Sequence, residues 1–114
     1  MEPRFNVWLE SNGEVAASEW RMRLLAAIDE HGSITDGARA MGVPYRVAWQ
    51  KVHEMERRLG ECLLETQTGG PEGGGARLTA AGKEHVARMR AFCERTDQAL
   101  RRIYEDTFGE PPRA

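Results

Sequence analysis

The side chains best suited to specific chemistry stand close together between Pro44 and Lys51. In a helix, Arg46 and Gln50 lie one turn apart and away from the apolar positions of the same segment. An arginine can donate two hydrogen bonds to guanine, and a glutamine amide can pair with adenine. We interpret both as candidate base-reading residues, with Tyr45 or Trp49 contacting a thymine methyl or a phosphate. The alternatives are a Trp49 packed against a neighbouring element and an Arg46 that is only solvated.

A second candidate is the glycine-rich stretch from Gly69 to Gly75. It is not a nucleotide-binding loop, because no Gly-Lys-Ser/Thr ending follows it. At the tip of a β-hairpin, its glycines would let the backbone approach a sugar-phosphate chain, with Thr66, Thr68 and Arg77 donating to phosphates. The alternative is a hairpin tip that binds no ligand.

The residue types used for catalysis and metal binding are scattered. The three histidines, His31, His53 and His85, have no ligand-like spacing to one another or to Cys62 and Cys93. We interpret His53 as a solvated residue on the exposed side of its helix and both cysteines as buried thiols. We therefore expect no enzyme activity and no metal or other cofactor.

Three amphipathic stretches predict the helices that position these residues, over about residues 19–31, 33–41 and 44–59. Ser18 and Ser33 are suitable N-caps, and Pro44 fits the first position of the third helix. A short connection at Gly42-Val43 joins the last two helices. Two helices joined by a short turn that contains glycine are typical of a helix-turn-helix.

A hairpin and a long helix are predicted after the third helix. Residues 62–66 and 76–78 favour two strands around the glycine-rich loop, and Thr79 can cap a helix of about 30 residues that ends at Gly109. Near the N-terminus, apolar residues alternate with polar ones from Phe5 to Leu9, which predicts a short strand or extended arm before a turn at 11–14.

The last predicted helix carries apolar and threonine residues at alternating spacings of three and four, namely Val86, Met89, Cys93, Thr96, Leu100, Ile103 and Thr107. This spacing is typical of a helix that packs against another helix. The first turns can pack on the chain's own domain while the rest projects. Leu100, Ile103, Tyr104 and Phe108 would then leave apolar surface, for which an identical chain is the simplest cover.

The charge balance gives mild support to a nucleic-acid partner. The formal net charge is −2, but residues 43–90 carry eight basic and six acidic side chains, whereas residues 1–42 carry four basic and seven acidic ones. Such a balance predicts modest non-specific affinity for DNA. No apolar run approaches the roughly 20 residues that span a bilayer, and no secretory signal is visible, so we expect a cytoplasmic protein without a membrane partner.

Several of these motifs together resemble a known family. The segments LAAIDEHGSI (25–34), ARAMGV (38–43), YRVAW (45–49) and the glycine-rich TGG…GGGARLT (68–79) resemble the N-terminal domain of ModE-type, molybdate-responsive transcriptional regulators. The stretch from Trp20 to Gly82 is more loosely similar to the DNA-binding domain of LysR-type regulators. The chain departs from the ModE pattern at Pro44, where serine is usual, at Gly37, where alanine is common, and at Glu61-Cys62.

The resemblance implies a dimer in which the segment from Tyr45 to Lys51 enters the major groove. It also implies that the first and last helices form the dimer interface. The expected DNA-contacting residues are Ser33, Thr35, Pro44, Tyr45, Arg46, Trp49, Gln50, Lys51, Thr66, Thr68 and Arg77. The expected interface residues are Trp20, Leu24, Val86, Met89, Cys93, Leu100, Ile103 and Tyr104.

The sequence therefore predicts a mainly α-helical winged helix-turn-helix with a small β-hairpin. Residues 1–82 would form the DNA-binding part with its N-terminal strand or arm, and residues 83–114 a dimerisation helix and short tail in the same structural unit. We expect a sequence-specific transcriptional regulator that binds double-stranded DNA as a homodimer and lacks oxyanion-sensing domains. The alternatives are a winged-helix interaction module that does not bind DNA and an oxyanion-binding protein; molybdate is suggested as an effector by the family association alone.

Overall fold

The chain begins with a β-hairpin that precedes the helices. The computed structural model describes residues 1–67 and 74–111, and the hairpin consists of β1 (Trp8–Ser11) and β2 (Glu14–Ser18). Its two turn residues, Asn12 and Gly13, have φ values of 52° and 80°, as the tightest hairpin turns require. The expected single strand is thus half of a hairpin. A bulge in the pairing turns both Ala16 and Ala17 inward, so β2 lacks the alternating pattern of an ordinary strand.

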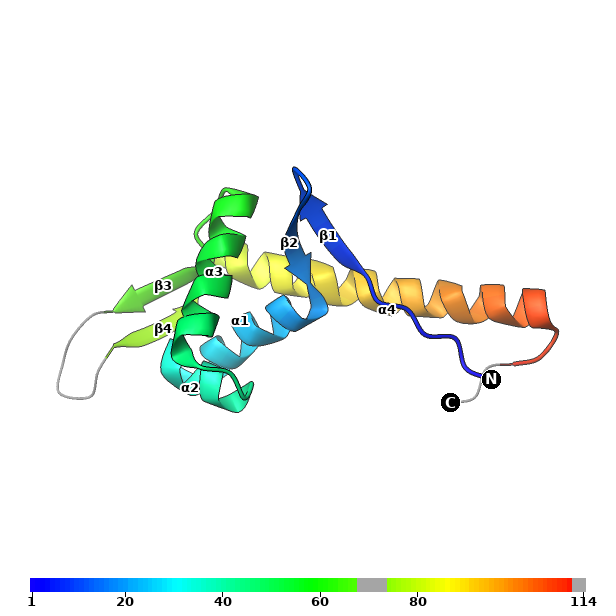
Figure 1. Ribbon diagram of the computed structural model, residues 1–114, viewed down its shortest axis with the longest axis horizontal. Helices are drawn as coiled ribbons and strands as arrows, with labels where there is room; N and C mark the ends of the chain where they lie inside the picture. Colours follow the sequence, from blue (N-terminus) through cyan, green and yellow to red (C-terminus); the bar gives the residue numbers. More distant parts are fainter. Residues whose placement is uncertain (68–73, 112–114) are drawn as a thin grey trace.

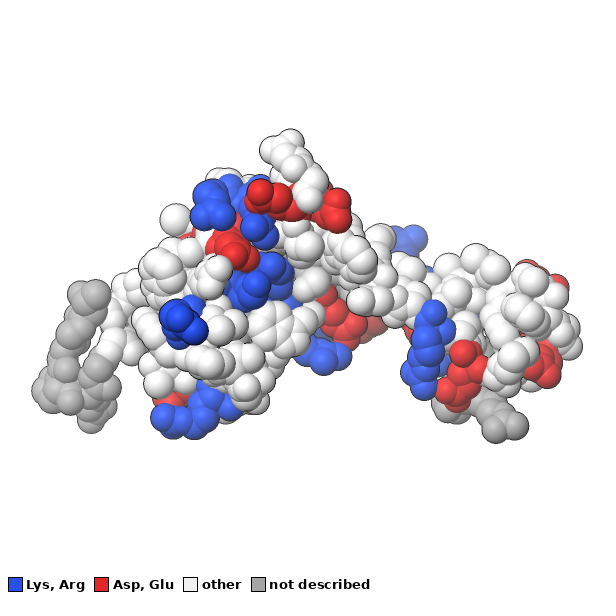
Figure 2. Space-filling view, viewed as in Figure 1, with Lys and Arg blue, Asp and Glu red and all other residues white. Residues whose placement is uncertain are grey.

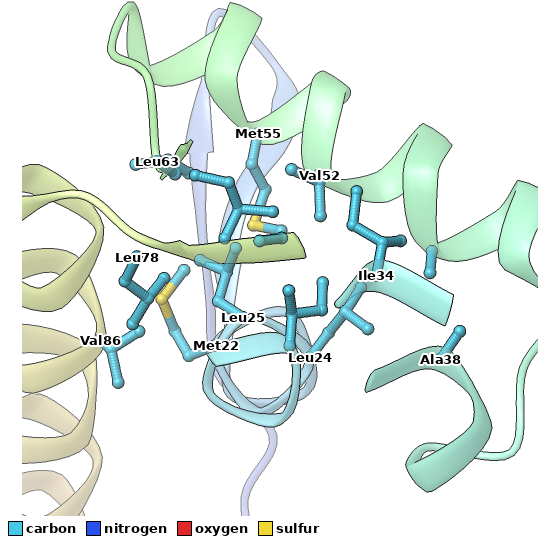
Figure 3. Packing of buried hydrophobic residues seen from close by; sticks show 14 of the residues in the cluster. Met22, Leu24, Leu25, Ile34, Ala38, Val52, Met55, Leu63, Leu78 and Val86 are labelled. Carbon is cyan, nitrogen blue, oxygen red and sulfur yellow. The ribbon is translucent and has the colours of Figure 1, made fainter. Parts of the chain in front are cut away.

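Helix α1 (Glu19–His31) lies at the centre of the fold (Figure 1). The Ser18 hydroxyl accepts a hydrogen bond from the Arg21 N–H at 3.1 Å, which confirms the predicted cap, and Gly32 ends the helix with a φ of 81°. Its inner side chains meet those of the other helices and the wing, as Figure 3 shows. Leu24, Leu25 and Ile28 have no exposed surface, so α1 is the element on which the others are placed.

The predicted helix-turn-helix is formed by α2 (Ile34–Ala40) and α3 (Tyr45–Leu59). The Ser33 hydroxyl accepts from the Asp36 N–H at 3.0 Å and caps α2. Pro44 precedes α3 rather than occupying its first turn, because its ψ of 149° is extended; its carbonyl accepts the first hydrogen bonds of the helix. The second helix is shorter than predicted, since Met41 already lies in the connection.

Gly37 allows α2 to lie directly against α1. A Cβ atom at this position would stand 2.5 Å from Cγ1 and 2.7 Å from Cα of Ile28, far inside van der Waals contact. The sequence had presented Gly37 only as a departure from a helix-favouring alanine. In the structure the glycine is required by the close approach of the two helices.

The wing consists of β3 (Leu64–Gln67) and β4 (Gly75–Leu78), paired antiparallel from Leu64–Leu78 to Gln67–Gly75. The Ala76 N–H donates to the Gly32 carbonyl at 2.8 Å, and the Leu78 N–H donates to Asp29 at 2.9 Å. These bonds fix the wing to the end of α1. Thr68 and the glycine-rich tip as far as residue 73 lie outside the described residues.

The long helix α4 (Ala80–Phe108) starts at the wing and extends well beyond the remaining elements, so its far end stands near the N-terminus (Figure 1). Thr79 caps it by accepting from the Gly82 N–H at 3.0 Å, while its hydroxyl donates to the Cys62 carbonyl at 2.7 Å. Cys62 itself is exposed, because Leu63 and Leu64 take the inward positions of this segment; the expectation that it is buried is wrong. Cys93 is half-buried, and burial raises the pKa of its thiol.

Candidate nucleic-acid interface

Helix α3 divides its side chains cleanly between the core and solvent. Ala48, Val52 and Met55 are at most 1% exposed and face α1. On the other side, Tyr45 is 51% and Trp49 46% exposed, and Arg46 and Gln50 are also exposed. The apolar side chains therefore anchor the helix while its N-terminal polar and aromatic residues face outward, as the sequence predicted.

The polar residues of this outer face differ in what they bind. Within residues 1–67 and 74–111, Arg46 makes no ion pair or side-chain hydrogen bond, so its five N–H donors are free. The Gln50 amide donates to Glu54 at 3.2 Å. Lys51 is half-buried, with its Nζ atom 3.9 Å from Glu54. Arg46 is consequently the side chain of the set that is most available to an incoming acceptor.

A groove of about 450 Å³ separates α3 from the wing and the start of α2. It is lined by residues from all three elements, including five that the sequence predicted: Ser33, Thr35, Tyr45, Trp49 and Thr66. The Ser33 hydroxyl already accepts the capping bond of α2, but its hydrogen remains available for donation. The fold thus brings together residues more than 30 positions apart.

Arg77 lies on the other side of the wing from this groove. Its Nε atom is 3.2 Å from Glu65, its cross-strand partner, and its side chain is 74% exposed. An exposed pair of this kind contributes little to stability, so the arginine can exchange its carboxylate for another anion at small cost. The sequence had not indicated that Arg77 is paired.

Trp49 lines this groove together with residues of the wing and of the start of α2, and it is 46% exposed. Its ring stacks on His53, one turn further along α3, with the ring centroids 3.8 Å apart and the planes inclined by 23°. The Nδ1 atom of His53 lies 2.8 Å from the Trp49 carbonyl oxygen. The sequence analysis interprets His53 only as a solvated residue. Its spacing of four residues from Trp49 and eight from Tyr45 puts it on the same side of α3, and this spacing could have indicated that it lines the same groove.

A cluster of ion pairs binds α3 to α1 and to the N-terminal hairpin. Arg21 of α1 lies 3.3 Å from Glu54, and these side chains are only 10% and 15% exposed. Arg58 approaches the same carboxylate at 3.5 Å and also binds Glu14 and the Val15 carbonyl of the hairpin, both at 2.8 Å. The cluster therefore joins α3 to both α1 and the N-terminal hairpin.

Glu54 is the acidic centre of this cluster. Burial alone would raise its pKa, but Lys51, Arg21, Gln50 and Arg58 together bring the pKa of this carboxyl below its ordinary value of 4.5. In Figure 2, acidic and basic side chains alternate on the face that bears α3 and the hairpin, whereas the surface between α3 and the wing carries little charge. Much of the basic charge of α3 is thus compensated within the protein.

The predicted interface residues fall into two groups. Leu24, Val86, Met89 and Tyr104 are all less than 10% exposed within the single chain, and Tyr104 donates to Glu110 at 2.7 Å. Trp20, Cys93, Leu100 and Ile103 retain accessible surface, and Ile103 is 60% exposed. Phe92, which sequence reasoning missed, is 43% exposed and lies eleven residues before Ile103, on the same face of α4.

Two further properties concern the described part of the chain. Within it, no three histidine, cysteine, aspartate or glutamate side chains lie close enough together to hold a metal ion. Its helices include none with the length and apolar character needed to cross a membrane.

The element order and the wing define a winged helix-turn-helix domain. Residues 20–83 match the model of the family described as bacterial regulatory helix-turn-helix protein, lysR family, and the chain belongs to this family. The fold is similar to that in the crystal structure of the CbnR_DBD–DNA complex, with a TM-score of 0.60, 22% identity and coverage of 80% of this chain and 99% of that one. It is also similar to the BenM_DBD/catB site 1 DNA complex, with a TM-score of 0.56, 20% identity and coverage of 74% and 88%.

Curated relatives include ModE-type proteins. The chain is 36% identical over 97 residues to the molybdenum transport protein ModE of Azotobacter vinelandii, which covers 85% of this chain and 36% of that protein. It is 36% identical over 86 residues to the DNA-binding transcriptional dual regulator ModE of Escherichia coli K12, with coverage of 75% and 33%. It is 42% identical over 81 residues to the molybdenum-pterin-binding protein MopB of Rhodobacter capsulatus, with coverage of 71% and 30%. The chain thus spans about a third of the length of these relatives.

Proposed function

We propose that this chain binds double-stranded DNA sequence-specifically as a homodimer and regulates transcription. The observation that carries the proposal is the outer face of α3, where the exposed Tyr45 and Trp49 stand beside the groove that leads to the wing and Arg46 has no partner among the described residues. A recognition helix uses its N-terminal residues at base edges in the major groove. Membership of a family of bacterial regulatory proteins supports the same function.

The contacts divide by side-chain chemistry. Arg46 has the free donors to bind guanine O6 and N7, and Gln50 can reach a base if its bond to Glu54 is exchanged. The hydroxyls of Ser33, Thr35 and Thr66, the guanidinium of Arg77 and the ammonium group of Lys51 are suited to phosphates. The predicted contact of Thr68 lies outside the described residues, and Pro44 has no hydrogen to donate, so its predicted DNA contact would be a van der Waals one. The base readout therefore comes from α3, and the wing and the start of α2 position it.

Dimerisation is proposed through the free face of α4. Phe92 and Ile103 are exposed on this face, with Thr96 and Ala99 between them at helical spacing. A second copy would cover this stripe, and Trp20, Cys93 and Leu100 would lie at its margin. A dimer could then present two copies of α3 to successive major grooves, about 34 Å apart. Sedimentation equilibrium of Ile103→Glu tests this arrangement, because the buried charge should yield a monomer.

Selection of duplex fragments by the purified chain, followed by measurement of the Kd of the selected sequence across salt concentrations, tests DNA binding. A DNA-binding protein that reads sequence should prefer the selected duplex to a scrambled one, and the logarithm of its affinity should fall linearly with the logarithm of the salt concentration. If no duplex is retained at low salt, the proposal is refuted and an interaction module is favoured. A scrambled duplex bound as tightly as the selected one would refute sequence-specific reading.

A further inference from the structure

The groove between α3 and the wing contains a histidine that the base-reading residues do not explain. His53 lies two helical turns beyond Tyr45, at a distance of about 12 Å along the axis. Because the first turn of a recognition helix is the part that reaches base edges, a residue this far along the helix and beside the wing would lie level with the DNA backbone in a complex. We propose that His53 is a phosphate-binding residue whose protonation strengthens DNA binding; the inference rests on the proposed DNA-binding function.

The orientation of the imidazole ring favours this role. Its Nδ1 atom lies 2.8 Å from the Trp49 carbonyl oxygen, which can only accept a hydrogen bond, so Nδ1 carries a hydrogen. The stacking on Trp49 at 3.8 Å fixes the plane of the imidazole. Within the described residues, Nε2 has no hydrogen-bond partner. When protonated, His53 therefore presents a second N–H from a ring that is already oriented.

The charges around the ring also favour this role. The start of α2 and the wing contribute no titratable side chain to the described lining of the groove. Their lining residues are Ser33, Ile34, Thr35, Thr66, Gln67, Gly74, Gly75 and Ala76. From α3, the phenol of Tyr45 lines the same groove. The described residues of the groove contribute no carboxylate that could pair with an imidazolium here, so a phosphate is the anion that would complement it.

The charged neighbours along α3 do not supply that anion. Glu54 is bound to Arg21, and the Glu56 carboxylate accepts from the Leu63 N–H at 2.8 Å. Arg57, one turn beyond His53, is exposed and adds to the positive potential on this side. On the wing, the carboxylate of Glu65 is paired with Arg77.

The protonation step defines the expected pH dependence. Histidine is the side chain whose charge changes between pH 5 and 8, so the contact should be strong at pH 6 and weak at pH 8. The test measures the Kd of the selected duplex at both pH values and at several salt concentrations. It compares the wild type with His53→Gln and with the control His85→Gln, since His85 is on α4 and pairs with Glu61 at 2.9 Å.

We expect His53→Gln to weaken binding roughly 3- to 10-fold at pH 6, with a salt slope lower by about one, and by less than about twofold at pH 8. His85→Gln should follow the wild type at both pH values. His53→Arg supplies a permanent cation on a planar group that can stack on Trp49, so its affinity at pH 8 should equal or exceed that of the wild type at pH 6. Thermal melting of each variant shows that it is folded.

The outcomes separate this inference from the proposed function. If the wild type binds no duplex, the proposed function fails. If the wild type binds and His53→Gln has the same Kd and salt slope at both pH values, the proposed function stands and the role of His53 is refuted. A variant that changes the preferred sequence without changing the salt slope would show that His53 contacts a base, which also overturns the phosphate assignment.

Discussion

Replacing Glu54 by glutamine should expose how strongly the ion cluster fixes α3. The change removes the carboxylate but leaves the Arg21 guanidinium, whose side chain is 10% exposed, without a charged partner at 3.3 Å. Breaking a fully buried pair costs about 3–5 kcal/mol, and the residual exposure and the remaining amide oxygen reduce this to about 2–3 kcal/mol here. Urea unfolding followed by circular dichroism measures the difference, as a lower midpoint with an unchanged slope.

The matched control is Glu84→Gln, which breaks the exposed pair of Glu84 with Arg88 on α4. Those side chains are 58% and 72% exposed, so the control should lose less than about 0.5 kcal/mol. A Glu54→Gln variant as stable as this control would refute the reasoning. The double variant with Arg21→Met provides a second check: the arginine substitution should cost less in the Glu54→Gln protein than in the wild type, with a coupling of about 0.5–3 kcal/mol.

The lowered pKa of Glu54 in the folded protein means that its carboxylate contributes fully to the free energy of unfolding above the ordinary pKa of 4.5, and that this contribution disappears as the pH falls through the folded-state pKa. The difference in free energy of unfolding between the wild type and Glu54→Gln, measured by urea unfolding, should therefore narrow below about pH 4. Gly37→Ala should destabilise the domain by about 1–3 kcal/mol, since its Cβ meets the Ile28 backbone; a higher melting temperature would contradict this close approach. Arg46→Ala should weaken specific DNA binding by about 1–3 kcal/mol and relax one position of each half-site in a fluorescence anisotropy assay, whereas Arg88→Ala should not change sequence preference.

Local signals predicted the helices well. Ser18, Ser33 and Thr79 each accept the capping hydrogen bond that their position suggested, and Gly32 and Gly60 end their helices in the left-handed conformation. These features depend on a few neighbouring residues. They are visible in a sequence for that reason.

The features that sequence reasoning missed depend on tertiary contacts. Arg21 and Glu54 are 33 positions apart, and no local pattern pairs them. The helical spacing of His53 puts it on the side of α3 that bears Tyr45 and Trp49, but its stacking on Trp49 depends on side-chain rotamers. From the sequence, Gly37 only lowers the stability of its helix. The structure shows that the backbone of α1 lies too close to leave room for a side chain there. In each case the residue itself is visible in the sequence, but the residue that it contacts is not.

The attachment of α4 has a mechanical consequence. Val86 and Met89 fix its first turns to the core, while the remainder of its 29 residues extends away from it. At about 1.5 Å per residue the stretch from Met89 to Phe108 is a lever of roughly 29 Å, and a tilt of 5° at its base moves the far end by about 2.5 Å. In the proposed homodimer, joined along α4, small changes in the packing of Val86 would alter the distance between the two copies of α3. One protein could then accommodate operators of slightly different half-site spacing.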